Sequence, residues 1–407
     1  MVSTVNLPDG SSPMLALAHP TEEEKQAQFK LNGAEWRGAL SLPAYLRREE
    51  ILASQALTKD GGITYWILVD TSMKENALDT TSPGRLQLAS CETYRKKALV
   101  WKDGEVCETV AHGIGSVFCP PHLRKRGYAA RLMKEVGTAL QTHQTTKETP
   151  CVFSILFSDI GKKFYDELGW EPFNSSHVSV PAAMSKAASV GALPTAQPLY
   201  ESDLAELCKI DEALVRRSLA SRPKGSNTAV ALIPDVQTIR WFHAREEFVG
   251  QELHGRTPEV KGAIIGSEKG KRIWCYWTRM WYNSNAQEAK GNTLHILRLV
   301  VENEEHSSWK GSETKPMNGS SKVHMHDAAI AALLLMAQRE AEEWNLEEVE
   351  VWNPSSATVA AAQMLDSSAS VVDRDSESIC SLMWYPEHEG KVADSIDWIG
   401  NEKYGWN

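Results

Sequence analysis

A basic turn that contains a glycine is the feature of the sequence whose residue types and spacing could do chemistry. It follows an apolar, strand-like segment at residues 115–119 and leads into a helical pattern at 130–141. Backbone N–H groups of such a turn point outward and the helix dipole adds positive potential, so the turn predicts a cradle for a pyrophosphate. The predicted binding residues are those of the strand end and the turn: Val117, Phe118, Cys119, Arg124, Lys125, Arg126, Gly127, Tyr128 and Ala129.

A dinucleotide-binding turn is the alternative interpretation of this glycine. That turn would require the pattern G-x-G-x-x-G, with an acidic residue about 20 positions later. The second glycine is missing, because Gly127 is followed by Tyr128 and Ala129. The segment Arg124-x-x-Gly127-x-Ala129 instead resembles the acetyl-CoA-binding signature Q/R-x-x-G-x-G/A of the GNAT acyltransferase superfamily.

A second motif follows the first in the expected order. Residues 151–157 are expected to form a strand, and residues 160–170 carry Phe164-Tyr165 and close at Gly169. This segment resembles the second GNAT motif, a helix that bears Phe-Tyr and ends at a glycine before a strand. The two motifs together predict the GNAT fold.

Several shorter segments resemble the fungal L-lysine N6-acetyltransferase family. The resemblance runs from about residue 15 to the end of the chain. The segments lie at residues 34–38, 64–66, 88–93, 115–121 and 158–165. The resemblance implies acetyl-CoA as the donor, the side-chain amine of free L-lysine as the acceptor, and a role in lysine catabolism. The residues themselves indicate only acyl transfer from CoA to an amine. A polyamine, another diamino acid or a protein lysine stays open as the acceptor, and so does a non-catalytic CoA-binding scaffold.

Acetylation of a lysine side chain requires a base. An amine with a pKa near 10.4 is protonated at pH 7, and losing that proton costs about 4.6 kcal/mol. The superfamily places residues of the central strands in the cleft, which makes Glu92 and His112 the candidates. We select Glu92. The alternative for Glu92 is a structural carboxylate that pairs with Arg95 or Lys96. The alternative for His112 is a hydrogen-bonded structural histidine.

Tyr165 is the predicted general acid. The resemblance implies that a tyrosine at this position of the second motif donates a proton to the departing CoA thiolate; the alternative is an aromatic anchor beside Phe164. The resemblance also implies that backbone N–H groups around Phe118 and Cys119 polarise the thioester carbonyl. We expect Cys119 itself to be a small buried apolar residue rather than a nucleophile, since the superfamily transfers the acyl group directly.

Recognition of free lysine needs a cation for its α-carboxylate and an acid or carbonyl for its ammonium groups. Four residues of the first half are candidates, although each could instead be structural or solvated: Arg37, Asp70, Glu92 and Asp159. Of these, we predict Arg37 and Asp159 as substrate-binding residues.

Two helices and a set of strands must position these residues in the first half. A capping box, Thr21 with Glu24, predicts a helix to about Trp36. Ser41 and Pro43 predict the start of a second helix. Strands are then expected at residues 63–69, near 86–92, near 98 and at 111–119.

The second half repeats this order of elements. Helices are expected at residues 202–219, 235–253, 327–344 and 357–365, and strands at 260–266, 273–281, 293–301, 349–352 and 378–384. A polar insert at 302–322 replaces the glycine turn, so this half is expected to bind no CoA. We therefore predict an α/β (α+β) chain with a catalytic GNAT domain at 1–178, a linker at 179–197, and a degenerate GNAT-like domain at 198–407 that contributes to the acceptor site. An unrelated α+β domain is the alternative for the last part.

Composition narrows the class of protein. The 407 residues carry a formal net charge of −10, which argues against a nucleic-acid binder held by phosphate contacts. The longest apolar stretch is too short to span a membrane, and the first residues lack a secretory signal. Seven scattered cysteines without a C-x-x-C pair predict reduced thiols and no metal site. A cytoplasmic enzyme acting on a small-molecule amine is expected.

Overall fold

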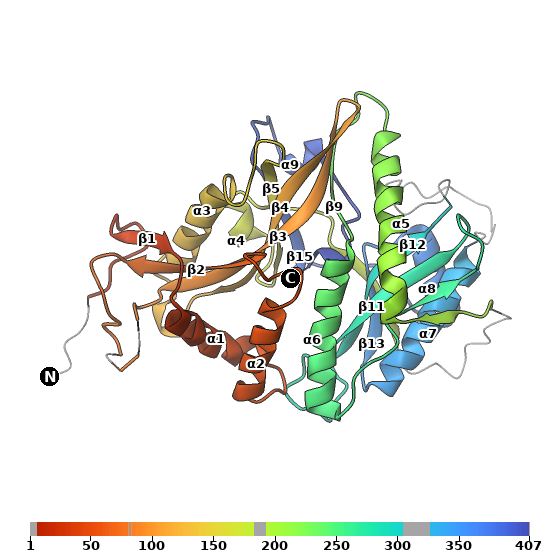
Figure 1. The fold of residues 1–407 in the computed structure, drawn as a ribbon, viewed down its shortest axis with the longest axis horizontal. Helices are drawn as coiled ribbons and strands as arrows, with labels where there is room; N and C mark the ends of the chain where they lie inside the picture. The colour runs from red at the N-terminus through yellow and green to blue at the C-terminus, as the bar shows by residue number, and fades with distance from the viewer. Residues whose placement is uncertain (1–5, 80, 83, 183–192, 304–325, 407) are drawn as a thin grey trace.

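Two β-sheets, each with helices packed against it, form the protein. The computed structural model describes residues 6–79, 81–82, 84–182, 193–303 and 326–406. Parts of the predicted linker and of the predicted polar insert lie outside the described residues. Figure 1 shows the first sheet with α1–α4 on the left and the second sheet with α5–α8 on the right.

Within the described residues, the first sheet has nine strands. Its main path runs β1-β2-β3-β4-β5-β15-β6, and β9 pairs with both β3 and β16. The strands are β1 (Leu15–Ala18), β2 (Ile63–Asp70), β3 (Ala89–Lys102), β4 (Glu105–Phe118), β5 (Cys151–Ser158), β6 (Glu171–Pro172), β9 (Thr228–Leu232), β15 (Ile379–Trp384) and β16 (Ile396–Ile399). The helices of this half are α1 (Glu22–Trp36), α2 (Leu42–Ala53), α3 (Tyr128–Leu140) and α4 (Lys163–Asp166), with the 3-10 turn η1 (Pro121–Leu123) before α3.

Local sequence signals account for several of these elements. The Thr21 hydroxyl accepts a hydrogen bond from the Glu24 backbone N–H, and the Glu24 carboxylate accepts one from the Thr21 backbone N–H. The predicted capping box therefore begins α1. Ser41 caps α2 as predicted. Residues 86–98, expected to hold two strands, instead contribute to one long strand, β3. It pairs with β4 across a tight turn in which Asp103 and Gly104 have φ of 53° and 96°, values that suit a two-residue hairpin.

In the part of the chain that the structure describes, the second sheet has seven strands in the order β14-β7-β13-β12-β11-β10-β8. They are β7 (Ser176–Pro181), β8 (Gln197–Leu199), β10 (Gly262–Ile265), β11 (Ile273–Met280), β12 (Thr293–Val301), β13 (Glu348–Trp352) and β14 (Val372–Asp373). The helices here are α5 (Glu201–Ala220), α6 (Val236–His254), α7 (Asp327–Glu343) and α8 (Ser356–Leu365). The short helix α9 (Val392–Ser395) packs against β6, β15 and β16 of the first sheet. The helices and strands predicted for the second half are confirmed, with small shifts at their ends.

The two halves share one topology and exchange strands. In the first half β4 runs parallel to β5 and α3 connects them; in the second half β12 runs parallel to β13 and α7 connects them. After α4 the chain adds β7 antiparallel to β13 of the second sheet, and after α8 it adds β15 antiparallel to β5 of the first sheet. The division at residues 179–197 stays a prediction, but each sheet is completed by a strand from across that boundary.

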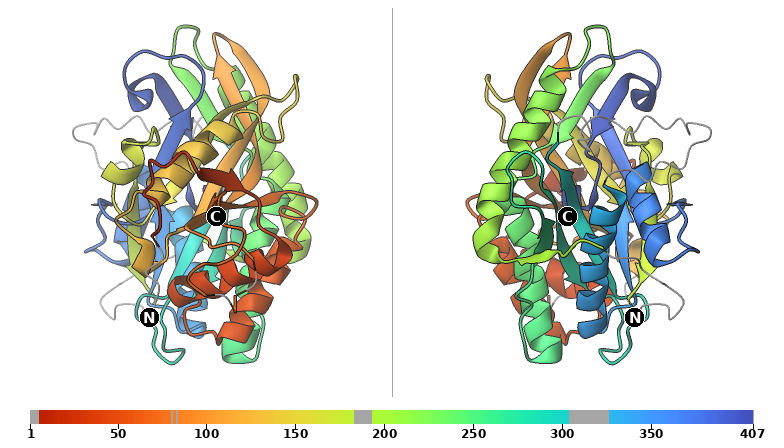
Figure 2. Two further views of the ribbon diagram at one scale, coloured as in Figure 1. Left: turned by 90° about the vertical axis from the view of Figure 1, so that its left-hand side faces the viewer. Right: turned by 90° about the vertical axis from the view of Figure 1, so that its right-hand side faces the viewer.

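A shared core joins the halves. One buried cluster contains Leu99 and Trp101 of β3 together with Phe242 of α6 and Trp274 of β11. The 3-10 turn η3 (Lys403–Gly405), near the C-terminal end, lies close to the centre of the molecule in all three views (Figures 1 and 2). The last residues of the described chain therefore reach the space between the two sheets.

Candidate functional site

A cavity of about 1370 Å³ lies between the two halves and is lined by residues of both. It opens where β4 and β5 part. The two strands pair from Val110 to Ile114, whereas residues 115–118 of β4 line the cavity together with Cys119, Arg124 and Ala129 after it. Opposite this point the β3–β4 register shifts between Ser90 and Glu92, and Ser116 takes a φ of 50°. This bulge turns the end of β4 toward the cavity.

The predicted CoA turn lies at the edge of this cavity. Gly127 has a φ of 82° and directly precedes α3, so a residue without a Cβ suits the position. Of the nine predicted CoA-binding residues, five line the cavity: Val117, Phe118, Cys119, Arg124 and Ala129. The Arg124 Nε donates to the Cys119 carbonyl oxygen over 3.0 Å, which holds that side chain beside the strand end.

Three residues of the turn, Arg126, Gly127 and Tyr128, contact a segment near the start of the chain to which no role was predicted. The Gly10 backbone N–H donates to the Arg126 carbonyl oxygen over 2.6 Å, and the Tyr128 hydroxyl donates to the Pro8 carbonyl oxygen. The Arg126 guanidinium lies 3.4 Å from the Leu7 carbonyl oxygen. Residues 7–12 therefore brace the turn, and no local sequence signal indicated this contact.

Glu92, the predicted base, lies on β3 in the wall of the cavity and is 5% exposed. Its Oε1 accepts hydrogen bonds from the Tyr94 hydroxyl over 2.8 Å and from the Ser116 hydroxyl over 2.6 Å. Across the described chain, no ion pair joins it to Arg95 or Lys96. Burial, and then the charge of Glu49, raise the pKa of Glu92 to about 7 against the opposing effect of the two hydroxyls.

His112 lies away from the cavity. It is fully buried, with its Nδ1 3.4 Å from the Cys151 Sγ and its Nε2 3.4 Å from the Gln144 Oε1. Burial, and then the neighbouring His143, lower the pKa of His112 to about 4. The geometry is that of the neutral, structural histidine considered as the alternative, so of the two predicted base candidates only Glu92 lines the cavity.

Tyr165, the predicted acid, lies on the short helix α4 and lines the cavity with 7% exposure. Burial raises the pKa of its hydroxyl well above the usual range, so the hydroxyl keeps its proton at neutral pH. Its ring meets the Phe164 ring edge-on at 5.0 Å between centroids. The structure thus places the tyrosine and Glu92 in one cavity.

The two predicted acceptor-binding residues lie in different places. Asp159 lines the cavity, and its Oδ1 accepts from the Ser378 backbone N–H over 2.9 Å. Arg37 is exposed at the end of α1 and lies outside the cavity lining.

The second half supplies polar cavity residues that the sequence analysis missed. They are His177, Arg245, His295, Glu350, Arg374 and Lys403. The Glu350 carboxylate lies 3.4 Å from the His295 Nδ1 and 3.7 Å from the His177 Nε2. These residues come from different strands and helices, so no local pattern links them.

Lys403 is the most deeply placed of these groups. It is 2% exposed, and its Nζ lies 4.2 Å from the centroid of the Trp352 ring and 4.3 Å from that of Trp406. Burial lowers the pKa of Lys403 to about 7, although Glu350 and Asp159 oppose the shift.

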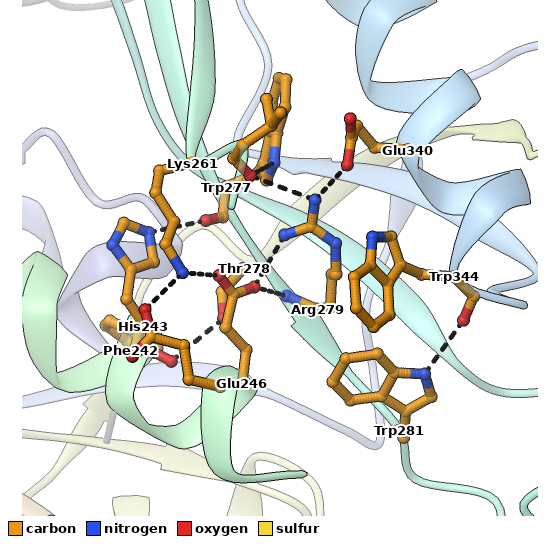
Figure 3. A network of polar contacts seen from close by, with 12 residues as sticks. Phe242, His243, Glu246, Lys261, Trp277, Thr278, Arg279, Trp281, Glu340 and Trp344 are labelled. Carbon is orange, nitrogen blue, oxygen red and sulfur yellow. Dashed lines mark hydrogen bonds and ion pairs between the residues drawn. The ribbon is translucent and has the colours of Figure 1, made fainter. Parts of the chain in front are cut away.

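A second polar cluster lies inside the second half, away from the cavity (Figure 3). The Glu246 carboxylate pairs with the Lys261 Nζ over 2.9 Å and with the Arg279 Nη1 over 3.0 Å. Arg279 also pairs with Glu340 and donates to the Val260 carbonyl oxygen over 3.1 Å. Burial raises the pKa of Glu246, but Arg279 and Lys261 outweigh it and hold this pKa below the usual value. This cluster is a structural ion network.

The described residues also bear on metal sites and membrane-spanning helices. No group of three or more His, Cys, Asp or Glu side chains is placed to hold a metal ion there. Within the same residues, every helix is too short or too polar to cross a membrane.

Comparison with known proteins adds the family. Residues 177–407 match the family model described as the LYC1 GNAT-like C-terminal domain. A lysine acetyltransferase of Yarrowia lipolytica is 25% identical over 313 residues, which cover 66% of this chain and 71% of that protein. An uncharacterised protein of Saccharomyces cerevisiae is 21% identical over 421 residues, which cover 94% of this chain and 95% of that protein.

A solved structure shares the fold. The N-myristoyltransferase of Saccharomyces cerevisiae with bound myristoyl-CoA has a TM-score of 0.51 and 8% identity, covering 92% of this chain and 80% of the other. The predicted GNAT resemblance, including the GNAT-like second half, is confirmed.

Proposed function

We propose that this chain, which belongs to the LYC1 GNAT-like family, transfers an acetyl group from acetyl-CoA to the N6 amine of free L-lysine. The observation that carries the proposal is the placement of Glu92. A buried carboxylate held by two hydroxyls, with a pKa of about 7, lines the cavity at the point where β4 and β5 part. The name of the Yarrowia relative supports lysine as the acceptor.

The donor side of the cavity suits a CoA thioester. The bulged end of β4 and the N-terminus of α3 present backbone N–H groups, and Arg124 adds a positive charge at the same edge. Acetyl-CoA, when bound, supplies an activated acyl group. The N-myristoyltransferase with the same fold binds myristoyl-CoA, which supports an acyl-CoA as the donor here.

Glu92 accepts the proton that the amine must lose. With its pKa near 7, Glu92 can exist in its charged form near neutral pH, and that form can take a proton directly or through a water. The amine nitrogen then forms a bond to the acetyl carbon while the bond from that carbon to the CoA sulfur breaks. Tyr165 holds a proton at its hydroxyl that the departing thiolate can take. The acylated nitrogen loses a second proton as the amide forms, and that proton restores the Tyr165 hydroxyl.

Thiol release from acetyl-CoA tests this proposal. The protein is incubated with L-lysine, L-ornithine, cadaverine, a polyamine and a lysine-containing peptide, and mass spectrometry locates the acetyl group. We expect lysine-dependent release and N6-acetyllysine as the product. Release with a different amine alone would replace the acceptor, whereas CoA binding without release would favour the scaffold alternative.

A further inference from the structure

The buried arginines of the described chain differ in how their charges are met. Arg48 is held by the Glu49 carboxylate, with its Nη2 2.6 Å from Oε1. Arg298 pairs with Asp211, and Arg279 with Glu246. Arg374 donates to the Ser176 carbonyl oxygen over 2.8 Å. Each of these guanidinium groups has a partner within the protein.

Arg245, which is only partly buried, differs from these four. It lies on α6 and lines the cavity, yet among the described residues its guanidinium makes no hydrogen bond or ion pair. Burial, and then the charge of Arg48, lower the pKa of Arg245 to about 10. A guanidinium keeps its charge at neutral pH, so an unmatched cation is held beside a second arginine in a half-enclosed space. An anion from a ligand would remove this imbalance.

A short series of contacts connects the helix that carries Arg245 to Glu92, the proposed base. Trp241 lies one turn earlier on the same face of α6, and its ring meets the Tyr94 ring edge-on at 5.6 Å between centroids. The Tyr94 hydroxyl in turn donates to Glu92. Arg245 thus lies on α6, which packs against α2, and is one helical turn from the tryptophan that contacts Tyr94.

We propose that the Arg245 guanidinium binds the carboxylate of the acceptor and so selects an amino acid over an amine that lacks a carboxylate. The proposal rests on the proposed function, because it assumes an acceptor with both groups. A planar guanidinium can donate two parallel hydrogen bonds to a carboxylate, which fixes the orientation of the acceptor as well as its charge.

The test compares two acceptors that differ only in the carboxylate, L-lysine and cadaverine. With wild type and Arg245→Met, kcat/KM is measured for both amines and KM for acetyl-CoA. Arg240→Met is the matched control, since Arg240 lies on the same helix but is half-exposed and pairs with Glu201. We expect Arg245→Met to lower kcat/KM for lysine about 10- to 100-fold, as for loss of a charge-assisted pair, and that for cadaverine less than about threefold.

A second variant keeps the test decisive if Arg245→Met does not fold. Arg245→Lys keeps a charge but not the two parallel donors, so we expect a smaller, lysine-specific loss. Thermal melting identifies any variant that is unfolded. Equal losses with both amines, no loss with lysine, or a raised KM for acetyl-CoA would overturn the assignment of Arg245 while leaving the proposed function intact. Absence of lysine-dependent release in wild type would overturn the proposed function, and this assignment with it.

Discussion

Glu92 and Glu246 are both buried glutamates, one in each half of the molecule, and their surroundings differ. Glu92 accepts hydrogen bonds from two neutral hydroxyls, and its pKa rises to about 7. Glu246 pairs with two buried cations, Lys261 and Arg279, and its pKa stays below the usual value. Burial alone raises the pKa of both groups, so the partners decide the outcome.

This difference separates a carboxylate that can exchange a proton from one that stays charged. Glu92 lines the cavity, where a ligand can reach it, whereas Glu246 is enclosed between α6 and β11 (Figure 3). A general base needs a pKa near the working pH, and an ion network needs a fixed charge. Substitution of each glutamate by the uncharged isostere should therefore have opposite consequences.

The largest expected effect is on activity. Glu92→Gln removes the proton acceptor but keeps the size of the side chain, so kcat with lysine at pH 7.5 should fall about 10²- to 10⁴-fold. Steady-state thiol release measures this. Glu105→Gln, a change at an exposed carboxylate of β4 outside the cavity lining, is the control. A loss of less than about threefold in Glu92→Gln would assign the base elsewhere.

The next effect is on stability in the other half. Glu246→Gln removes one counter-charge of Lys261 and Arg279, and we expect the free energy of unfolding to fall by about 3 kcal/mol. Urea denaturation at pH 7 measures it. The matched control is Glu247→Gln, since Glu247 also contacts Lys261 but is half-exposed. That variant should lose less than about 1 kcal/mol. Similar losses of stability in Glu246→Gln and Glu247→Gln would contradict a special role of Glu246 in the ion network.

Substitution of Glu92 should change the free energy of unfolding in the opposite direction to substitution of Glu246. Its pKa is about 7 in the folded protein and near 4.5 when unfolded, so the folded state holds the proton more tightly. The free energy of unfolding therefore falls as the pH rises between these values. Glutamine does not titrate, so the stability of Glu92→Gln relative to wild type should grow by about 2–3 kcal/mol from pH 5 to pH 8. A constant difference across this range would show that the pKa is not raised.

Tyr165→Phe should have the smallest effect. A CoA thiolate leaves readily, so a proton from the Tyr165 hydroxyl assists the step only modestly, and kcat should fall roughly tenfold. The same assay measures it, with Phe164→Leu as a neighbouring packing control. A fall in KM for lysine without a change in kcat would contradict the role of an acid.

The sequence predicted what depends on local pattern. Thr21 with Glu24, Gly127 before α3, and Phe164-Tyr165 each carry their structural signal within a few residues. Glu92 was predicted through family resemblance, and only the fold brings it to Tyr94, Ser116 and the cavity.

The rest depends on contacts between distant segments. Arg245 and Lys403 approach the cavity because α6 and the C-terminal turn fold back between the sheets. The pairing of β15 with β5 crosses more than 200 residues, and an apolar strand does not specify which sheet it will join. The contact of Gly10 with the CoA turn likewise could not be predicted from the sequence of either segment alone.

The pH dependence of kcat for lysine-dependent thiol release, measured in wild type and in Glu92→Gln, tests the central claim most directly. With saturating substrates, wild-type kcat should rise with pH through an apparent pKa near 7, as Glu92 loses its proton, and then level off. The residual activity of Glu92→Gln should lack this step. A step near pH 7 that persists in Glu92→Gln would contradict the assignment of Glu92 as the base.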